Sequence, residues 1–338
     1  MSNLRLSVTL DPPALKSVMR LINVHTKHMR TFYGNDIPDY AILSHTWLRD
    51  HEEVTYQRYH LNDDWQRLRG GKKIIYLCQQ AAKDQCRWAW IDTCCIDKTN
   101  NAELSEAINS MFRWYQDAKV CYVYLADIGS NEHKIFYTSR WWDRAWTLQE
   151  LLAAKTVEFY DKDWRNIGAK AELAEVIALR KNIDKEILRD PDMIQFRSVA
   201  QRMSWAAHRQ ATRREDLAYA LLGIFGINMN MMYGEGDKAF IRLQIEIMRS
   251  TNDMSLFAWN FRLDYLDAVM AKTETNGRSI DTYGRIREES PSVAEISRNG
   301  LFAPTPSCFS MCGDIEFLQE YADNIGALLR PLKYRKPA

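Results

Sequence analysis

The first half of the chain alternates between short, continuous apolar runs and segments whose apolar residues recur at helical spacing. Apolar runs that end in small polar residues are typical of buried parallel strands, whereas apolar residues at i, i+3, i+4 and i+7 predict one face of a helix. Because the two patterns alternate, we expect an α/β fold whose mainly parallel sheet is flanked by helices through right-handed crossovers. The predicted strands are 18–24, 40–45, 88–92, 119–125 and 156–160, with helices near 72–84 and 102–117 and a short helix that carries Trp146 and Glu150.

The pattern changes after Trp164, where helical spacing dominates. Helices are expected at 169–180, 198–207, 215–225 and 238–250, followed by a strand at 254–259. The chain is therefore predicted to divide into four parts: a flexible leader at 1–17, an α/β core at 18–165, a helical extension packed on that core at 166–260, and an irregular C-terminal segment at 261–338.

Charge and cysteine content exclude several classes of partner. The sequence has 45 Lys and Arg against 44 Asp and Glu, a net charge of +1, so no global field draws the chain to nucleic acid or to an acidic membrane. The N-terminus lacks the basic and apolar regions of a signal peptide, and no run of about 18 apolar residues exists. Seven cysteines, two of them adjacent, are typical of reduced thiols in a cytosolic protein. We therefore expect a soluble, cytoplasmic protein with no nucleic-acid or membrane partner.

Polar residues follow two of the predicted parallel strands. Ser44, His45 and Trp47 stand at the carboxyl end of one strand, and Asp92 stands at the carboxyl end of another. Open α/β sheets bind ligands at the carboxyl ends of their strands, so these side chains are candidates to line a pocket. Asp92 would there orient the hydroxyl groups of a ligand or a neighbouring arginine; its structural alternative is to cap the loop.

The adjacent Cys94 and Cys95 leave a further choice open. Either thiol, with His45 as its base, would form a thiol–imidazole pair. The alternative is that both thiols pack as small apolar groups and that His45 is a buried core histidine with its hydrogen bonds satisfied.

Trp146 and Glu150 lie four residues apart and therefore share one side of their short helix. A carboxylate beside an indole, on a helix that runs into a strand, is typical of an active-site fragment. The alternative is an ordinary amphipathic helix whose Glu150 points into water.

The sequence gives no sign of a bound metal or cofactor. The Gly-Gly-Lys-Lys of 70–73 lacks the spacing of a phosphate-binding loop, and no G-x-G-x-x-G follows a strand. Neighbouring cysteines cannot act as a C-x-x-C chelate, and His25 and His28 lack a paired cysteine motif, so no metal site is expected.

Three strings together resemble the fungal heterokaryon-incompatibility (HET) domain. They are Tyr-Ala-Ile-Leu-Ser-His-Thr-Trp at 40–47, Trp-Ile-Asp-Thr-Cys-Cys-Ile-Asp at 90–97 and Arg-Ala-Trp-Thr-Leu-Gln-Glu-Leu-Leu at 144–152. The segments 212–219, 233–236 and 255–259 look like those that follow this domain in fungal NLR-type proteins. The resemblance implies that 18–165 is a HET core, that it triggers cell death when non-self is sensed, and that a longer protein would add a C-terminal nucleotide-binding and repeat region.

HET domains look like distant relatives of TIR domains, whose flavodoxin-like sheet can cleave NAD. The segment 146–151 is similar to the TIR segment Trp-Cys-Leu-x-Glu-Leu, which implies that Glu150 is a catalytic carboxylate and that NAD is a substrate and not a bound cofactor. By the same resemblance a TIR-like/flavodoxin-like sheet and self-association into oligomers are expected. The implied members of the NAD pocket are Ser44, His45, Trp47, Asp92, Arg144 and Trp146.

This chemistry needs no metal. Cleavage of the nicotinamide–ribose bond expels a neutral leaving group and builds an oxocarbenium-like cation, which a carboxylate in a partly dry pocket stabilises. Trp146 or Trp47 could stack on the cationic nicotinamide ring, and Arg144 could meet a phosphate or pair with Asp143 or Asp97. A non-enzymatic module that oligomerises and recruits a partner remains the main alternative, and a cysteine hydrolase is a weaker one.

Overall fold

The computed structural model describes residues 18–61, 63–259, 302–313 and 315. Contacts divide the chain into two compact units: Met1–Pro191 with Tyr219–Met232, and Asp192–Ala218 with Tyr233–Ala338. Each unit is described by itself below. The leader expected at 1–17 and nearly all of the segment expected at 261–338 lie outside the described residues.

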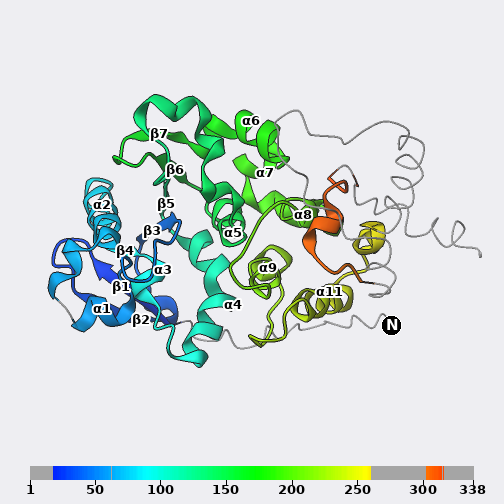
Figure 1. The fold of residues 1–338 in the computed structure, drawn as a ribbon, viewed down its shortest axis with the longest axis horizontal. Helices are drawn as coiled ribbons and strands as arrows, with labels where there is room; N and C mark the ends of the chain where they lie inside the picture. Colours follow the sequence, from blue (N-terminus) through cyan, green and yellow to red (C-terminus); the bar gives the residue numbers. More distant parts are fainter. Residues whose placement is uncertain (1–17, 62, 260–301, 314, 316–338) are drawn as a thin grey trace, which may run out of the picture. The chain divides into compact units, whose positions relative to one another are not determined.

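The first unit is built on a seven-stranded sheet of order β2-β1-β4-β3-β5-β6-β7 (Figure 1). β4, β3, β5 and β6 are parallel to one another, whereas β2, β1 and β7 are joined to their neighbours by antiparallel pairing. The predicted α/β fold with a mainly parallel core is confirmed. The strands are β1 Val18–Asn23, β2 Met29–Tyr33, β3 Tyr40–His45, β4 Trp88–Trp90, β5 Val120–Tyr124, β6 Val157–Tyr160 and β7 Asn166–Ala169.

Strand order identifies the point at which the direction of winding of the sheet changes. Numbered along the chain, the four parallel strands have the order 2-1-3-4, which is the start of the flavodoxin-like order. The order reverses between β3 and β5, so the carboxyl ends of these two strands mark the topological switch point at which open α/β sheets bind ligands. His45, the last residue of β3, pairs in register with Tyr124, the last residue of β5.

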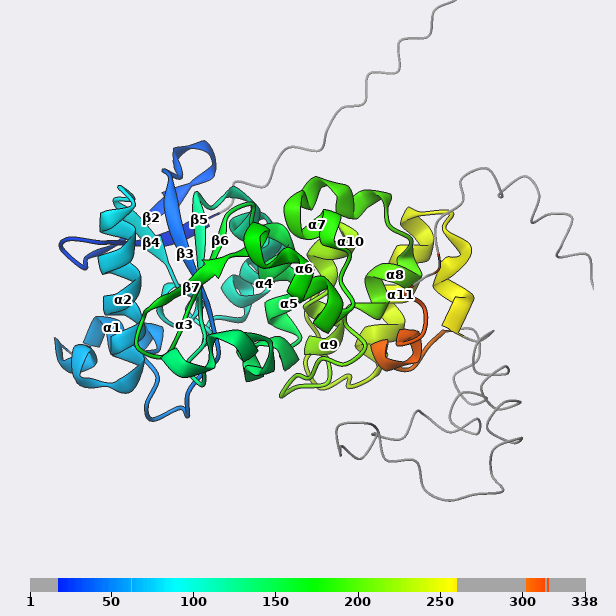
Figure 2. The same ribbon diagram turned by 90° about the horizontal axis from the view of Figure 1, so that it is seen from above.

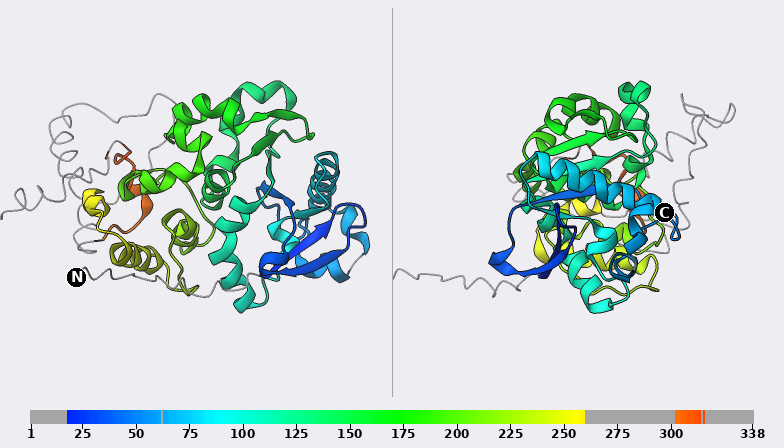
Figure 3. Two further views of the ribbon diagram at one scale, coloured as in Figure 1. Left: turned by 180° about the vertical axis from the view of Figure 1, so that it is seen from behind. Right: turned by 90° about the vertical axis from the view of Figure 1, so that its left-hand side faces the viewer.

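Two edge strands were not predicted from the sequence. β2 forms a hairpin with β1 at one end of the sheet (Figure 3), where the Asn23 side chain accepts hydrogen bonds from the backbone of His25 and Thr26 and so fixes the turn. β7 pairs with β6 at the other end. Both are short and partly exposed, so they lack the continuous apolar run that identifies a buried strand.

Helices cover both faces of the sheet (Figure 2). α1 (Tyr56–Leu61) and α2 (Arg69–Lys83) lie on one face, and α4 (Asn101–Asp117) and α5 (Trp146–Ala153) lie on the other. The apolar face predicted for α2 is fully buried. Asp92 belongs to the short helix α3 (Asp92–Cys95) and not to β4, because the chain leaves the sheet after Trp90 and Ile91 precedes the helix.

Two further features complete the first unit. α6 (Lys170–Lys181) and α7 (Lys185–Arg189) follow β7, and α10 (Leu222–Phe225) packs on α4. Gly223 permits that packing, because a Cβ there would lie 2.0 Å from Cβ of Phe112. All seven cysteines of the chain are free thiols, and six of them are buried.

The second unit is helical in its described part. It contains α8 (Val199–Ser204), α11 (Lys238–Ser250) and the 3-10 helices η6 (Met254–Phe257) and η7 (Pro306–Phe309). The helix expected at 215–225 is instead two short helices, α9 (Asp216–Tyr219) and α10. The strand expected at 254–259 is wrong: the Asp253 carboxylate accepts from the backbone of Ser255 and caps η6, so this local hydrogen bond prevails over the apolar pattern.

No helix among the described residues is long and apolar enough to cross a bilayer.

Candidate functional site

Ser44 and Glu150 meet at the carboxyl end of β3. Ser44 is fully buried, and its Oγ donates a hydrogen bond to Oε2 of Glu150. Trp141 Nε1 in turn donates to Ser44 Oγ at 2.7 Å, so the three side chains form one hydrogen-bonded chain. Only 8% of Glu150 is exposed. The alternative in which Glu150 points into water is therefore wrong.

The start of α5 is fixed by the 3-10 helix η4 (Arg140–Asp143) that precedes it. Thr147 Oγ1 donates to the backbone carbonyl of Trp141 at 2.6 Å, and the Trp142 ring stacks on Phe159 of β6. The sequence Arg-Trp-Trp-Asp therefore places one indole against Ser44 and the other against the sheet. This turn determines where Glu150 lies, one turn further along α5.

The end of α5 is closed by a buried lysine. Lys170 is 1% exposed, and its Nζ donates to the backbone carbonyls of Leu151 at 3.0 Å and Ala154 at 2.5 Å. An ammonium at this end of a helix satisfies carbonyls that have no intrahelical partner. Because every residue of α5 from Thr147 to Ala153 is buried, the helix has no polar face, and Glu150 is the only acidic group it carries.

The environment of Glu150 raises its pKa to about 7. Burial is the largest cause, because it disfavours the charged carboxylate. The hydrogen bond from Ser44 and the positive charge of Arg144 lower the pKa, whereas the negative charge of Asp92 raises it further. Glu150 is therefore poised between its neutral and ionised forms near neutral pH.

Asp92 gathers three donors beside this carboxylate. His45 Nε2 lies 3.1 Å from Oδ1 of Asp92, and Oδ2 accepts from Trp47 Nε1 at 2.8 Å and from Lys98 Nζ at 3.3 Å. Burial alone would raise the pKa of Asp92, but Lys98, His45 and Trp47 together hold this pKa well below its ordinary value. Asp92 is therefore a fixed negative charge at the end of the sheet.

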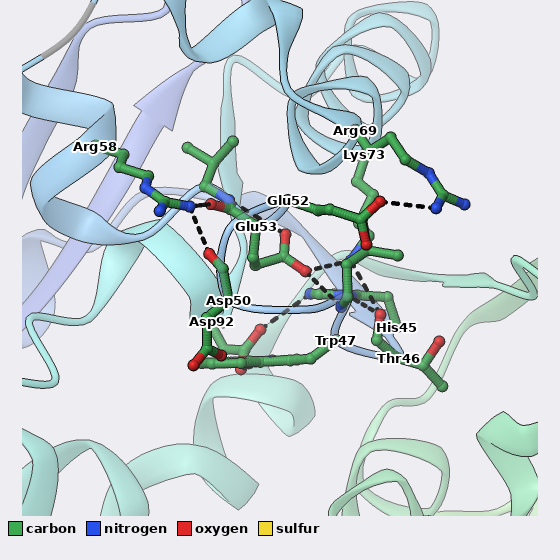
Figure 4. A network of polar contacts seen from close by, with 12 residues as sticks. His45, Thr46, Trp47, Asp50, Glu52, Glu53, Arg58, Arg69, Lys73 and Asp92 are labelled. Atoms are coloured by element: carbon green, nitrogen blue, oxygen red, sulfur yellow. Dashed lines mark hydrogen bonds and ion pairs between the residues drawn. The ribbon is translucent and has the colours of Figure 1, made fainter.

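A buried ion pair that sequence reasoning missed lies behind His45 (Figure 4). Lys73 Nζ donates to Oε2 of Glu53 at 2.6 Å and to the carbonyl of Thr46 at 2.9 Å, and it lies 3.0 Å from His45 Nδ1. Both partners of the ion pair are only 2% exposed. Burial lowers the pKa of Lys73, and the neighbouring Glu53 carboxylate opposes that change.

The glycines before Lys73 were the signal for this pair. A Cβ at Gly70 would lie 2.5 Å from Oε1 of Glu53, so only glycine lets the first turn of α2 close on the loop that carries this carboxylate. The glycines at 70 and 71 therefore do not form a phosphate-binding loop, and Gly70 allows a close approach of the backbone to a buried acid.

Both ring nitrogens of His45 have polar partners. Nδ1 lies 3.0 Å from Lys73 Nζ and 3.0 Å from the carbonyl oxygen of Thr46, and Nε2 lies 3.1 Å from Oδ1 of Asp92. With both ring nitrogens occupied, His45 is not paired with a thiol. Burial also holds the pKa of Cys94 well above its ordinary value. The thiol–imidazole pair is therefore not formed in this structure.

Arg144 and Trp146 complete the set of candidate residues. Both are half-buried, Arg144 just before α5 and Trp146 at its first residue. The charge of Arg144 acts on Glu150 and on Lys73, which places its guanidinium near both. Within the described residues, no group of three or more His, Cys, Asp or Glu side chains is arranged to hold a metal ion.

Segments 212–219 and 233–236 are joined by hydrogen bonds in the second unit. The carboxylate of Glu215 accepts hydrogen bonds from the backbone of Gly234 at 2.7 Å and Gly236 at 3.0 Å. Both glycines have positive φ angles, 104° and 58°, which L side chains rarely adopt. The Tyr-Gly-Glu-Gly turn therefore binds the buried Glu215 carboxylate through its backbone N–H groups.

Comparison with known proteins agrees with the motifs. Residues 40–138 match the family described as heterokaryon incompatibility protein (HET), and residues 238–333 match a domain of unknown function, DUF8212. Over 221 residues the chain is 44% identical to vegetative incompatibility protein HET-E-1 of Podospora anserina, which covers 62% of this chain and 16% of that protein. No solved structure matches the chain. The HET match spans β3 to η3 (Ser130–Thr138) and so contains the Ser44 and Asp92 ends of the site, and the chain therefore carries a HET domain.

Proposed function

We propose that this protein is a cell-death effector of fungal incompatibility that hydrolyses NAD when its HET domains cluster. The similarity to a protein named for vegetative incompatibility supports the biological role. That relative is much longer, since the chain spans 16% of its length. The proposal for the chemistry rests on the site itself, with Glu150 as the catalytic carboxylate.

One observation carries the chemical part of the proposal. Glu150 is a buried carboxylate with a pKa of about 7, held by Ser44 at the switch point of a flavodoxin-like sheet. Strongly perturbed carboxylates in such positions are typical of catalytic groups. If position 150 served only to support the fold, an apolar side chain of the same volume would stabilise the protein more than a buried carboxylate does.

In the proposed reaction, the bond between C1′ of the ribose and the nicotinamide nitrogen breaks, and its electron pair leaves with the nitrogen. The cationic ring becomes neutral nicotinamide, and the developing charge on the ribose is stabilised by ionised Glu150. Water then adds to C1′ and loses a proton. Ser44 keeps the carboxylate in place, and Arg144 provides a positive charge for a phosphate of the substrate.

Glu150 is too deeply buried in this conformation to meet a substrate. With 8% of the residue exposed, a nucleotide does not reach the carboxylate in this conformation. Activity then requires a rearrangement around Glu150, and assembly of several copies is the event that we propose supplies it. The isolated chain is accordingly expected to be nearly inactive.

The test is nicotinamide release by the full chain tethered at high density to beads, compared with the same protein in dilute solution. Glu150→Gln is expected to abolish release and toxicity while the protein remains folded. Glu158→Gln on β6 is the matched control, because Glu158 bonds Tyr160 and not Ser44. Equal release from the Glu150→Gln protein would refute the enzymatic proposal. Toxicity without any release would instead favour the non-enzymatic oligomerising module, for which the closed surroundings of Glu150 are the supporting observation.

A further inference from the structure

The indole of Trp47 and the carboxylate of Asp92 form two walls of a small site for a positive charge. Trp47 Nε1 donates to Oδ2 of Asp92 at 2.8 Å, which fixes the indole edge against the carboxylate and leaves a ring face beside it. An aromatic face next to an anion attracts cations, including flat or alkylated nitrogen cations. We refer to these two side chains as the cation box.

Lys98 occupies the cation box. Its Nζ lies 3.4 Å from the centroid of the Trp47 ring and 3.3 Å from Oδ2 of Asp92. Other lysines contact aromatic rings less closely: Lys72 Nζ is 5.1 Å from the Tyr76 ring. Lys98 and Asp92 remain 31% and 24% exposed, so solvent reaches the box. Lys98 therefore contacts Trp47 and Asp92 closely while the site stays partly open to solvent.

The cation box is adjacent to the proposed catalytic group. Asp92 bonds His45, and the preceding residue of β3, Ser44, bonds Glu150, so both carboxylates are tied to the end of the same strand. His45 also links Asp92 to the Lys73–Glu53 pair. Asp92 and Trp47 bond each other and Asp92 also bonds His45, whereas Lys98 Nζ makes no hydrogen bond among the described residues other than that to Asp92. Lys98 Nζ is thus held in the box by one hydrogen bond and by its contact with the Trp47 ring.

We propose that Lys98 is a built-in competitor that fills the cation box until a cationic pyridinium ring, the nicotinamide of oxidised NAD, displaces it. This inference rests on the proposed function, because it assigns part of the same site to the recognition of the substrate's charge. The ring is a cation before the glycosidic bond breaks and neutral afterwards. Lys98 therefore loses to the substrate and regains its place against the product, which favours release of nicotinamide.

The comparison of NAD with NADH isolates this effect. The two differ at the nicotinamide ring, which is cationic in NAD and neutral in NADH, and they share the same phosphates. Binding is measured as depletion of each nucleotide from solution by the full chain tethered at high density to beads, in a Glu150→Gln background so that NAD is not consumed. Lys98→Met keeps the length of the side chain and removes its charge, and Lys72→Met is the control for loss of a lysine–aromatic contact elsewhere.

Lys98→Met is expected to raise the preference for NAD over NADH about tenfold, which corresponds to about 1.4 kcal/mol. Lys72→Met is expected to leave the preference unchanged. An unchanged or reduced preference in Lys98→Met would overturn the proposal. A reduced affinity for both nucleotides with an unchanged preference would overturn it in the same way, because Lys98 would then act on the phosphates that the two nucleotides share.

A second probe separates this inference from the proposed function. Tetramethylammonium carries the charge without any nucleotide, and the indole N–H resonance of Trp47, assigned with Trp47→Phe, reports its arrival in the box. The resonance is expected to shift at lower probe concentration in Lys98→Met than in the parent. No shift in either protein would refute the cation box. A shift without binding or cleavage of NAD would retain the box and refute the NADase proposal.

Discussion

The burial of Glu150 predicts a cost in stability that depends on pH. Its pKa is about 7 in the folded protein and close to its ordinary value of 4.5 in the unfolded chain. Below pH 4.5 the carboxyl is protonated in both states and costs nothing. As pH rises from 4.5 to 7, the unfolded state loses the proton first, so the free energy of unfolding falls, and above pH 7 the full cost is present.

The magnitude follows from the two pKa values. A change from 4.5 to about 7 corresponds to about 3 kcal/mol at high pH, and to about 1 kcal/mol at pH 5.5. Glu150→Gln keeps an acceptor for Ser44 and removes the titration. The stability of Glu150→Gln relative to the parent is therefore expected to increase by about 2 kcal/mol between pH 5.5 and 8.5, or roughly 4–8 °C in Tm.

Thermal unfolding of both proteins across this pH range is the assay. Glu158→Gln controls for the general effect of removing one carboxylate from the sheet region. A difference between Glu150→Gln and the parent that stays flat from pH 5.5 to 8.5 would show that Glu150 ionises as an exposed glutamate does. The burial argument, and with it the main support for the catalytic role, would then be wrong.

Three further outcomes are expected. Because ionised Glu150 is the proposed active form, nicotinamide release by clustered protein at saturating NAD should rise with pH around an apparent pKa of about 7 and level off above it; a rate that falls over this range would contradict the assignment. Lys73→Met should cost about 3–5 kcal/mol in urea unfolding because it leaves the Glu53 carboxylate buried without its partner, and adding Glu53→Gln should restore much of this; no recovery in the double variant would argue against the pair. Gly223→Ala should lower the free energy of unfolding by about 1–3 kcal/mol because its Cβ meets Cβ of Phe112, and Phe112→Gly, which removes that atom, should make the same substitution nearly neutral; equal costs in both backgrounds would contradict the steric cause.

The regular part of the fold was predictable because burial leaves a period in the sequence. β3 and β5 are buried along their whole length, and the buried positions of α2 follow helical spacing. The pattern failed where burial does not decide conformation. β2 and β7 are exposed edges, and the 254–257 segment is apolar but is fixed as a 3-10 helix by the Asp253 cap.

The candidate site was predictable as a location and only partly as a set of contacts. Strand ends predicted that Ser44, His45 and Asp92 lie at one edge, and the structure joins His45 to Asp92 and Ser44 to Glu150. The Lys73–Glu53 pair was missed, because an ion pair between residues 20 positions apart has no periodic signal and the glycines before Lys73 indicate a close approach without naming the acid that is approached. The assignment of these residues to NAD stays a prediction.

The buried thiol of Cys121 can report the opening of the structure that activation is proposed to require. Cys121 lies on β5 and is fully buried, and the carboxylate of Glu150 adds to burial in raising the pKa of its thiol. A thiol so placed reacts with alkylating reagents only when its surroundings open. The rate at which iodoacetamide modifies Cys121 therefore reports how often the structure around Glu150 opens to solvent. Comparing this rate in dispersed and in assembled protein requires neither substrate nor any substitution in the chain.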